Sequence, residues 1–241
     1  MDKLLIVVPA CNEEDCIELV IRDIHKHLPS YDLVVIDDAS TDSTPEIIRR
    51  MWEPLVSHPI NIGAGGAIET GLKYALKNGY KKALVIDGDG QHDPSEAYKL
   101  INAMEKNTAD VVIGSRFVEA NNYSTPFARK TGILLFSFIT LLISGTKIAD
   151  VTSGFRLYNL NAMRFLINEY PADFPDAETI ILLLLSGFKL VEVPVILRQR
   201  LSGQSMYTIS RSIYYPFKVI VAIIAVILRK LLIKRGGEHV N

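Results

Sequence analysis

Short apolar runs alternate with helical segments through the first half of this chain, and this alternation limits the folds open to it. Four runs are bounded by polar or turn residues, as buried strands are: 4–8, 33–36, 83–86 and 111–113. Helical patterns fill the three intervals between these runs: 13–28, 44–51, 66–77 and 94–106. The rhythm predicts an α/β fold with a mostly parallel central sheet, helices on both faces and ligands at the carboxyl ends of the strands.

The charge balance and the cysteine content narrow the class of protein. With 26 basic and 27 acidic residues, the chain has no bulk attraction for nucleic acid, and we expect no such partner. Cys11 and Cys16 imply no disulfide framework and favour a reducing compartment. The apolar run before Pro9 has only five residues, which is too short for a secretory signal, so we expect the protein to stay on the cytoplasmic side.

Polar motifs follow three of the predicted strands at the point where each strand ends: 9–14, 37–42 and 87–92. In the last of them, Asp87 and Asp89 are two residues apart and therefore aim both carboxylates into one crevice. That pair suits Mg²⁺ or Mn²⁺ holding a diphosphate. A lone Asp-x-Asp is more often an ordinary acidic loop. Asn12 or Ser40 could be simple caps, and Asp37 and Asp38 could be the solvated start of a loop. Three such motifs on one edge of one sheet indicate a site.

A glycine-rich stretch, residues 61–67, leads into the third predicted helix. Its glycines would let backbone amides approach a phosphate. The spacing matches neither the dinucleotide-binding pattern nor the P-loop, and a tight turn explains it equally well.

Six motifs follow one another along the chain: 8–13, 36–42, 61–67, 87–92, 114–117 and 152–156. Together they closely resemble family 2 glycosyltransferases, and within them the dolichol-phosphate mannose synthase branch, over about residues 3–207. The resemblance implies a GT-A fold for residues 1–207 and an inverting transfer from a nucleotide diphosphate sugar. The remaining residues, 208–241, form a separate segment.

Carried over by position, the resemblance places the nucleoside at the first two strand ends. Four residues of the first motif would surround it: Pro9, Ala10, Cys11 and Glu13. Asp37 or Asp38 would lie at the base. The family commonly has Tyr where this chain has Cys11, so any aromatic contact from that position is absent.

The same resemblance places the diphosphate and its metal ion at the third motif. Asp87 would lie by the ribose or the metal ion, and Gly88 leaves room for the nucleotide. Asp89 and Gln91 would be ligands of Mg²⁺ or Mn²⁺. The sequence identifies neither the sugar nor the nucleotide, UDP or GDP.

The implied acceptor is a polyprenyl phosphate, either dolichyl or undecaprenyl. A phosphate monoester has a second pKa of about 6 and is already nucleophilic at neutral pH, so it needs cations to position it and no base. The candidate cations are Arg116, Arg129, Arg156 and Arg200. Arg116 and Arg129 resemble the family's acceptor-phosphate contacts, and each could instead form a surface ion pair. Arg200 with residues 202–206 resembles the loop that closes over the diphosphate, although Gln204 and Met206 stand where the family often has Lys.

Two other functions stay open at this stage. Some branches of the family use an Asp as base for a hydroxyl acceptor, and Asp176 could take that role. Asp173, Asp176 and Glu178 could instead simply begin the helix that runs through Ile180 to Leu185. The other function is that of a non-catalytic subunit that binds a nucleotide sugar at a membrane.

The C-terminal segment predicts contact with a membrane surface. Residues 219–228 are uninterruptedly apolar between Lys218 and Arg229, and Lys218, Ala222, Ala225 and Arg229 share one narrow helical stripe. We expect an amphipathic helix whose cations reach the headgroups, which makes the protein monotopic or peripheral at the cytoplasmic face. Packing between copies in a homo-oligomer is the rival, and a tilted span would draw the cations into hydrocarbon. The apolar run 133–143 is too short to span and suits a buried or interfacial helix.

Overall fold

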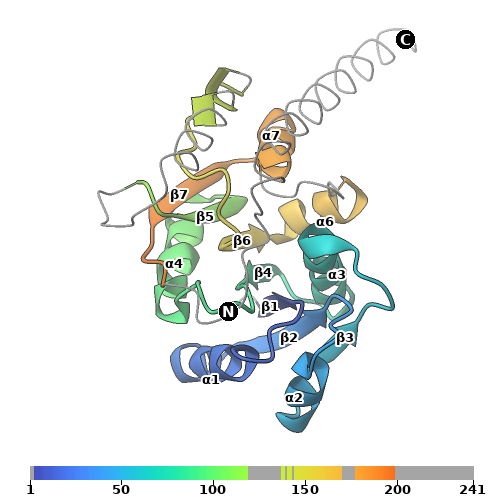
Figure 1. The fold of residues 1–241 in the computed structure, drawn as a ribbon. Coiled ribbons are helices and arrows are strands. Elements are labelled where there is room, and N and C mark those ends of the chain that lie inside the picture. The colour runs from blue at the N-terminus through green and yellow to red at the C-terminus, as the bar shows by residue number, and fades with distance from the viewer. Residues whose placement is uncertain (1–2, 119–136, 139, 143, 170–176, 199–241) are drawn as a thin grey trace, which may run out of the picture.

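A central sheet organises the structure, a computed structural model that describes residues 3–118, 137–138, 140–142, 144–169 and 177–198 (Figure 1). Within these residues the sheet has seven strands in the order β3-β2-β1-β4-β6-β5-β7. Their bounds are β1 Leu4–Ala10, β2 Asp32–Asp37, β3 Leu55–Ser57, β4 Lys82–Val85, β5 Val111–Ser115, β6 Arg156–Asn159 and β7 Leu190–Pro194. The four predicted strands are β1, β2, β4 and β5.

All strands of this sheet except β6 run in one direction. β6 is antiparallel to β4 and β5, whereas the pairs β1/β2, β1/β4, β2/β3 and β5/β7 are parallel. The prediction of a mostly parallel sheet is confirmed. The carboxyl ends of β1, β2 and β4 consequently lie at one edge.

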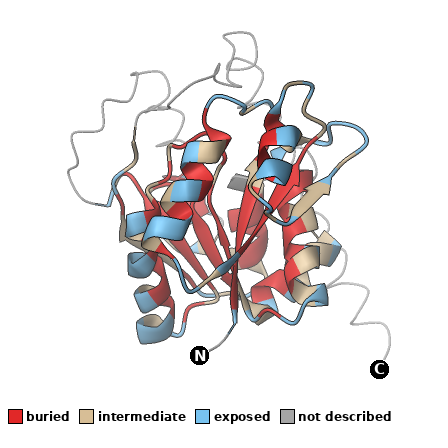
Figure 2. Ribbon diagram, turned by 90° about the horizontal axis from the view of Figure 1, so that it is seen from below, coloured by how far each residue is buried: buried red, intermediate tan, exposed pale blue. Residues whose placement is uncertain are grey.

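Helices cover both faces of the sheet, as predicted (Figures 1 and 2). One face carries α1 Ile17–His27, α2 Thr44–Arg50 and α4 Ala97–Asn107, and the other carries α3 Gly63–Lys77, α6 Leu160–Glu169 and α7 Ala177–Leu185. Alternate β1 residues serve the two layers, because Leu5 and Val7 belong to the α3 core and Ile6 and Val8 to the α1 core. In Figure 2 the buried strands lie between helices whose outer faces are exposed.

Two helices begin at residues that differ from the prediction. α1 begins at Ile17 and not at residue 13, because a turn comes first in which the Cys16 amide donates to the Glu13 carbonyl (3.0 Å). α3 begins at Gly63 and not at residue 66, because the carboxylate of Asp38, in the loop after β2, accepts the amides of Ile62 and Gly63 and so caps the helix. α4 is preceded by a single 3₁₀ turn, Pro94–Glu96.

α3 packs closely on β1. A methyl group at Gly71 would lie 2.2 Å from Cγ1 of Val7, so only glycine allows this approach. The close contact fixes the start of α3 over the ends of β1 and β2, where the candidate site lies.

The segments predicted to meet a membrane are described only in part. Residues 208–241 lie outside the described residues. Of the run 133–143, Phe138 and Leu142 are exposed while Thr140 is buried, and the choice between a buried and an interfacial helix stays a prediction. None of the described helices has the length and apolar character needed to cross a membrane.

Candidate active site

The three predicted motifs meet at the carboxyl end of β1. The amide of Gly88 donates to the carbonyl of Pro9 (3.0 Å), and the amide of Asp38 donates to the carbonyl of Ala10 (2.9 Å). The loop after β4 and the loop after β2 are therefore hydrogen-bonded to either side of the last two residues of β1. This arrangement brings together the residues that the sequence analysis placed around a nucleotide.

The loop after β1 is braced against the loop after β2. Asn12 has a φ of +56° and accepts the Thr41 amide on Oδ1 (2.8 Å), while its own amide donates to Ser40 Oγ (2.9 Å). The Glu13 amide donates to Thr44 Oγ1 (2.8 Å). Asn12 is thus a structural brace, and the backbone from Pro9 onward is held in shape before any ligand arrives.

Cys11 keeps a neutral thiol beside this backbone. Burial raises the pKa of the Cys11 thiol above its usual range, so it stays protonated at neutral pH. Its sulfur lies 3.3 Å from Nδ2 of Asn61, which also donates to the Asp38 carbonyl (3.1 Å). The thiol offers a small, weakly polar surface at the position where the family commonly has an aromatic ring.

The carboxylate of Asp38 is used in hydrogen bonds that hold the glycine-rich loop. Oδ1 accepts the Ile62 amide (3.0 Å) and contacts Nδ1 of His58 (2.8 Å), and Oδ2 accepts the Gly63 amide (2.7 Å). Because these amides already bind a carboxylate, the tight-turn explanation of the 61–67 stretch fits the structure better than an approach to phosphate.

Asp37 retains more capacity to accept hydrogen bonds than Asp38. Both residues are buried, but the hydrogen bond found at the Asp37 carboxylate in the described structure is the Ser40 amide to Oδ1 (3.0 Å). A carboxylate has about four acceptor positions. The choice between Asp37 and Asp38 for the base stays a prediction, and the geometry favours Asp37.

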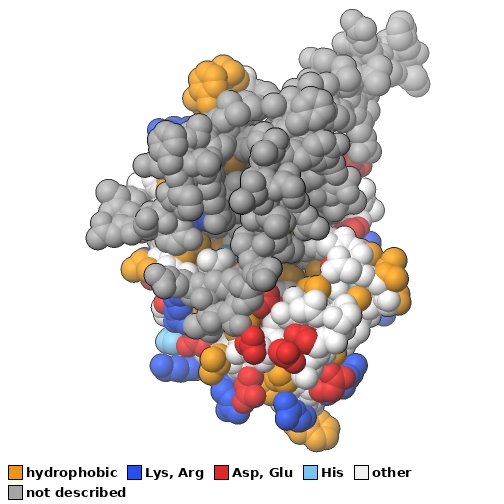
Figure 3. Space-filling view, viewed as in Figure 1, with side chains coloured by type: hydrophobic (Ala, Val, Ile, Leu, Met, Phe, Trp, Pro, Cys, Tyr) orange, Lys and Arg blue, Asp and Glu red, His pale blue; other side chains and the backbone are white. Residues whose placement is uncertain are grey.

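This edge of the sheet is acidic. Glu14 and Asp15 are exposed in the loop after β1, and Figure 3 shows acidic side chains gathered over α1 and β2. An anionic diphosphate would be repelled here unless a cation accompanied it.

The Asp-x-Asp pair offers oxygen ligands of the type that Mg²⁺ and Mn²⁺ prefer. Asp89 is 6% exposed and accepts the Gln91 amide on Oδ1 (2.9 Å), while the Asp87 side chain is 38% exposed. In the described ranges, no three His, Cys, Asp or Glu side chains cluster so as to hold a metal ion. Two carboxylates and the Gln91 amide oxygen fit an ion that completes its coordination with phosphate oxygens and water.

The 148–154 loop forms a wall beside Asp87. A methyl group at Gly154 would lie 3.1 Å from Oδ2 of Asp87 and 3.5 Å from Cε1 of His92. Ser153 Oγ donates to the Gly114 carbonyl (2.6 Å), so this wall is joined to the end of β5.

Replacing Gly154 with alanine should displace the Asp87 carboxylate, because the added methyl group competes with it for space. We expect the Mn²⁺ concentration that gives half-maximal nucleotide binding to rise by up to about tenfold. Thermal-shift titrations of UDP and GDP with Mn²⁺ measure this change. An unchanged Mn²⁺ requirement would show that the Asp87 carboxylate does not face the donor.

Arg116 is the guanidinium of a buried ion pair. It is 5% exposed and binds Asp150 through Nε (2.7 Å) and Nη2 (2.6 Å), and its amide donates to the same carboxylate (3.0 Å). Nη2 also donates to Thr152 Oγ1 (2.7 Å). Arg116 therefore forms an ion pair, as one of the two alternatives from sequence held, but the pair is buried and not at the surface. Contact with an acceptor phosphate stays a prediction, and the observed role of Arg116 is to anchor the 148–154 loop.

Glu192 on β7 holds the backbone that carries Asp150, the partner of Arg116. Its carboxylate accepts the amides of Ala149 (2.7 Å) and Asp150 (2.8 Å). Burial raises the pKa of the Glu192 carboxyl, and these two hydrogen bonds oppose the rise. Sequence reasoning missed both Asp150 and Glu192, because nothing local in the sequence connects either of them to Arg116.

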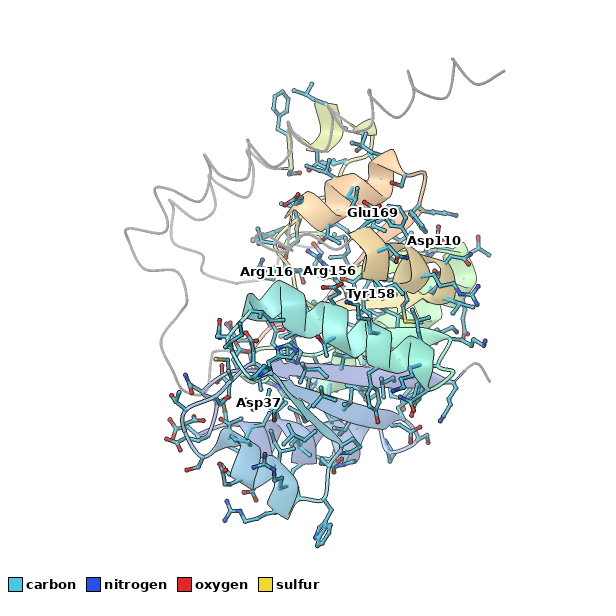
Figure 4. The ribbon with its side chains drawn as sticks, turned by 90° about the vertical axis from the view of Figure 1, so that its right-hand side faces the viewer. Asp37, Asp110, Arg116, Arg156, Tyr158 and Glu169 are labelled. Atoms are coloured by element: carbon cyan, nitrogen blue, oxygen red, sulfur yellow. The ribbon has the colours of Figure 1, made fainter. Side chains whose placement is uncertain are left out.

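The other predicted cations differ in how they are placed. Arg156 is buried on β6, and its Nη2 donates to the Val151 carbonyl (3.2 Å). In Figure 4, Arg116 and Arg156 lie apart from Asp37, which is at the end of β2. Arg129, Arg200 and the alternative base Asp176 lie outside the described residues.

The predicted closing loop lies outside the described residues, and the segment that precedes it adjoins the Asp-x-Asp loop. His92 forms an antiparallel bridge with Leu197, and the Arg198 amide donates to the Gln91 carbonyl (2.9 Å). The Arg198 guanidinium binds Asp23 (2.5 Å) and Asp93 (2.7 Å). The chain therefore leaves β7 directly beside the candidate metal ligands.

Comparison with known proteins gives concordant matches. Residues 5–166 match the family described as Glycosyl transferase family 2. The UDP-N-acetylglucosamine–dolichyl-phosphate N-acetylglucosaminyltransferase of Methanococcus voltae is 31% identical over 216 residues, which cover 80% of this chain and 85% of that protein. The undecaprenyl-phosphate mannosyltransferase of Micrococcus luteus is 30% identical over 213 residues, covering 84% and 86%.

A solved structure shares the fold. Glucosyl-3-phosphoglycerate synthase from Mycobacterium tuberculosis, in complex with Mn²⁺, UDP-glucose and phosphoglyceric acid, superposes with a TM-score of 0.68 at 20% identity. The match covers 93% of this chain and 79% of that one. The likeness confirms an α/β, GT-A-like fold.

Proposed function

The chain belongs to glycosyl transferase family 2, and we propose that it transfers one sugar from a UDP- or GDP-sugar to a polyprenyl phosphate, with inversion at the transferred carbon. The observation that carries the proposal is the junction of three strand ends that sets Asp87 and Asp89 beside Pro9 and Ala10. The acceptor class is supported by relatives about 30% identical whose names specify dolichyl and undecaprenyl phosphate.

Each part of this site has a task in the proposed reaction. The braced backbone from Pro9 to Glu13 would hold the nucleoside, with Asp37 accepting from the base. Asp89 and Gln91, with Asp87 beside them, would hold Mg²⁺ or Mn²⁺, which when bound neutralises charge on the leaving diphosphate. Gly88 has no side chain, and the hydrogen bond from its amide to the Pro9 carbonyl keeps the loop close to β1.

The acceptor side of the site requires positive charge and no proton removal. A phosphate monoester with a second pKa of about 6 is mostly a dianion at neutral pH, so attack on the sugar needs alignment. Arg129 and Arg200 are the proposed phosphate contacts. Arg116 would act with them or, through its ion pair with Asp150, would hold the loop that shapes the crevice.

Membrane association is part of the proposal because the acceptor is a lipid. The segment 208–241 would lie as an amphipathic helix on the cytoplasmic surface, with Lys218 and Arg229 at the headgroups. The exposed Phe138 and Leu142 support a surface that meets lipid.

An acceptor panel tests the proposed function. The protein is incubated with UDP-glucose, UDP-GlcNAc or GDP-mannose, Mn²⁺, and undecaprenyl phosphate, undecaprenol or a free saccharide. Sugar is then measured in the organic and aqueous phases. We expect transfer to the phosphate alone. Transfer to undecaprenol or to the saccharide would overturn the proposed acceptor class.

Asp176→Asn separates this acceptor from a hydroxyl acceptor. For a phosphate acceptor we expect a change in kcat of less than about threefold, because no base is needed. A hydroxyl acceptor predicts a loss of about 100-fold or more, in the range of general base catalysis. Glu178→Gln, which changes a carboxylate in the first turn of α7, is the matched control for any effect on the start of that helix.

A further inference from the structure

His92 lies behind the Asp-x-Asp loop, where the proposed function gives it no task. It is 5% exposed, and its ring stacks on Phe155 with centroids 4.9 Å apart and planes 17° apart. The backbone bridge to Leu197 holds it from the other side. The ring is thus fixed in position and orientation.

Both nitrogens of this ring lie close to Asp87. The Asp87 amide lies 3.0 Å from Nδ1, and since an amide can only donate, Nδ1 must carry a lone pair. The ring proton of the neutral imidazole is then assigned to Nε2. Nε2 lies 3.5 Å from Oδ2 of Asp87, within ion-pair range, so the nitrogen that carries the proton is the one beside the carboxylate.

The 148–154 loop limits the space beside the carboxylate of Asp87. Gly154 faces both groups, and a methyl group there would crowd Asp87 Oδ2 at 3.1 Å and His92 Cε1 at 3.5 Å. The carboxylate therefore lies beside both the His92 ring and the 148–154 loop. Buried partners of this kind orient metal-ligating carboxylates and set their affinity.

We propose that His92 is a positioning residue for Asp87: it accepts the Asp87 amide on Nδ1 and directs Nε2–H at the carboxylate, so that Asp87 faces the metal-bound nucleotide diphosphate. The inference rests on the proposed function, since it concerns the same donor site. In this proposal His92 acts through Asp87 and contacts neither the sugar nor the acceptor.

Three substitutions separate the two nitrogen contacts. His92→Phe removes both and keeps a ring to stack on Phe155. His92→Asn keeps an acceptor near the position of Nδ1, and His92→Gln places a donor near the position of Nε2. His25→Gln is the matched control, because His25 contacts Glu53 (2.6 Å), which precedes β3 at the end of the sheet away from the site.

The measurements are the melting temperature of each protein without metal and the Mn²⁺ concentration that gives half-maximal UDP or GDP binding by thermal shift. We expect His92→Phe to raise the Mn²⁺ requirement by about tenfold or more, with His92→Gln closer to wild type than His92→Asn. His25→Gln should leave it unchanged. A purely structural role would lower the metal-free melting temperature and leave the Mn²⁺ requirement of the folded protein as in wild type.

An unchanged Mn²⁺ requirement in His92→Phe overturns the inference. If His92→Phe does not fold, His92→Gln and His92→Asn are compared instead. A lower Mn²⁺ requirement in His92→Gln than in His92→Asn supports the inference. Equal or reversed Mn²⁺ requirements overturn it. Failure of the proposed function is a different result, namely that wild-type protein shows no Mn²⁺-dependent nucleotide binding.

Discussion

Asp89→Ala is expected to abolish metal-dependent sugar transfer, with a loss of at least about 100-fold. Asp89 is almost fully buried at the end of β4, and its Oδ1 also accepts the Gln91 amide (2.9 Å). The substitution therefore removes a proposed ligand and releases the turn that presents a second one. Mn²⁺-dependent nucleotide binding should disappear together with turnover.

Asp89→Asn separates the effect of losing the turn's hydrogen bond from the effect of losing the ligand's charge. The asparagine keeps an oxygen that can accept the Gln91 amide but carries no charge for the cation. We expect it to retain the melting temperature of the wild type without metal and to lose most of the Mn²⁺-dependent shift. Full Mn²⁺-dependent turnover in Asp89→Ala would contradict the assignment of the metal ligands.

Asp150→Ala is expected to be the most destabilising single change at the site. It leaves the buried Arg116 guanidinium without the carboxylate that binds its Nε and Nη2. Removing one partner of a buried pair costs about 3 to 5 kcal/mol. For a chain of this length, each kcal/mol corresponds to about 2 to 4 °C, so the melting temperature should fall by more than about 6 °C.

A surface pair of similar length is the matched control. Arg22 and Glu18 are joined at 2.7 Å, but their side chains are 66% and 45% exposed, so Glu18→Ala should cost less than about 1 kcal/mol. Adding Arg116→Leu to Asp150→Ala should recover part of the lost stability, because it removes the unpaired charge. Equal melting temperatures for Asp150→Ala and Glu18→Ala would mean that Arg116 is not held as the structure shows.

The fold was predictable where apolar periodicity is local. The strand patterns at 4–8 and 83–86 identify β1 and β4 because their residues are buried on both faces. β3, β6 and β7 escaped prediction for different reasons. In β7 only Leu190 is buried, so it lacks the buried apolar run of β1 and β4. β3 has only three residues at the sheet edge, and β6 begins with a buried Arg156 whose place depends on pairing with β4 and β5.

The candidate site was predictable where strand ends supply the ligands. Asp87, Asp89, Pro9 and Ala10 come together because parallel strands end at one edge. The supporting contacts were not predictable in this way. Arg116 meets Asp150 from 34 residues away, and Glu192 reaches Asp150 from 42 residues away, so only the folded sheet brings them together.

The most direct test of the central claim is the mass of the lipid product. Wild-type protein is incubated with UDP-glucose, UDP-GlcNAc or GDP-mannose, Mn²⁺ and undecaprenyl or dolichyl phosphate, and the organic extract is examined by mass spectrometry. We predict a polyprenyl phosphate that carries one sugar, and its absence when EDTA removes the metal. Contradiction would come from the absence of any lipid-linked sugar with every donor, or from the same product at the same rate without metal.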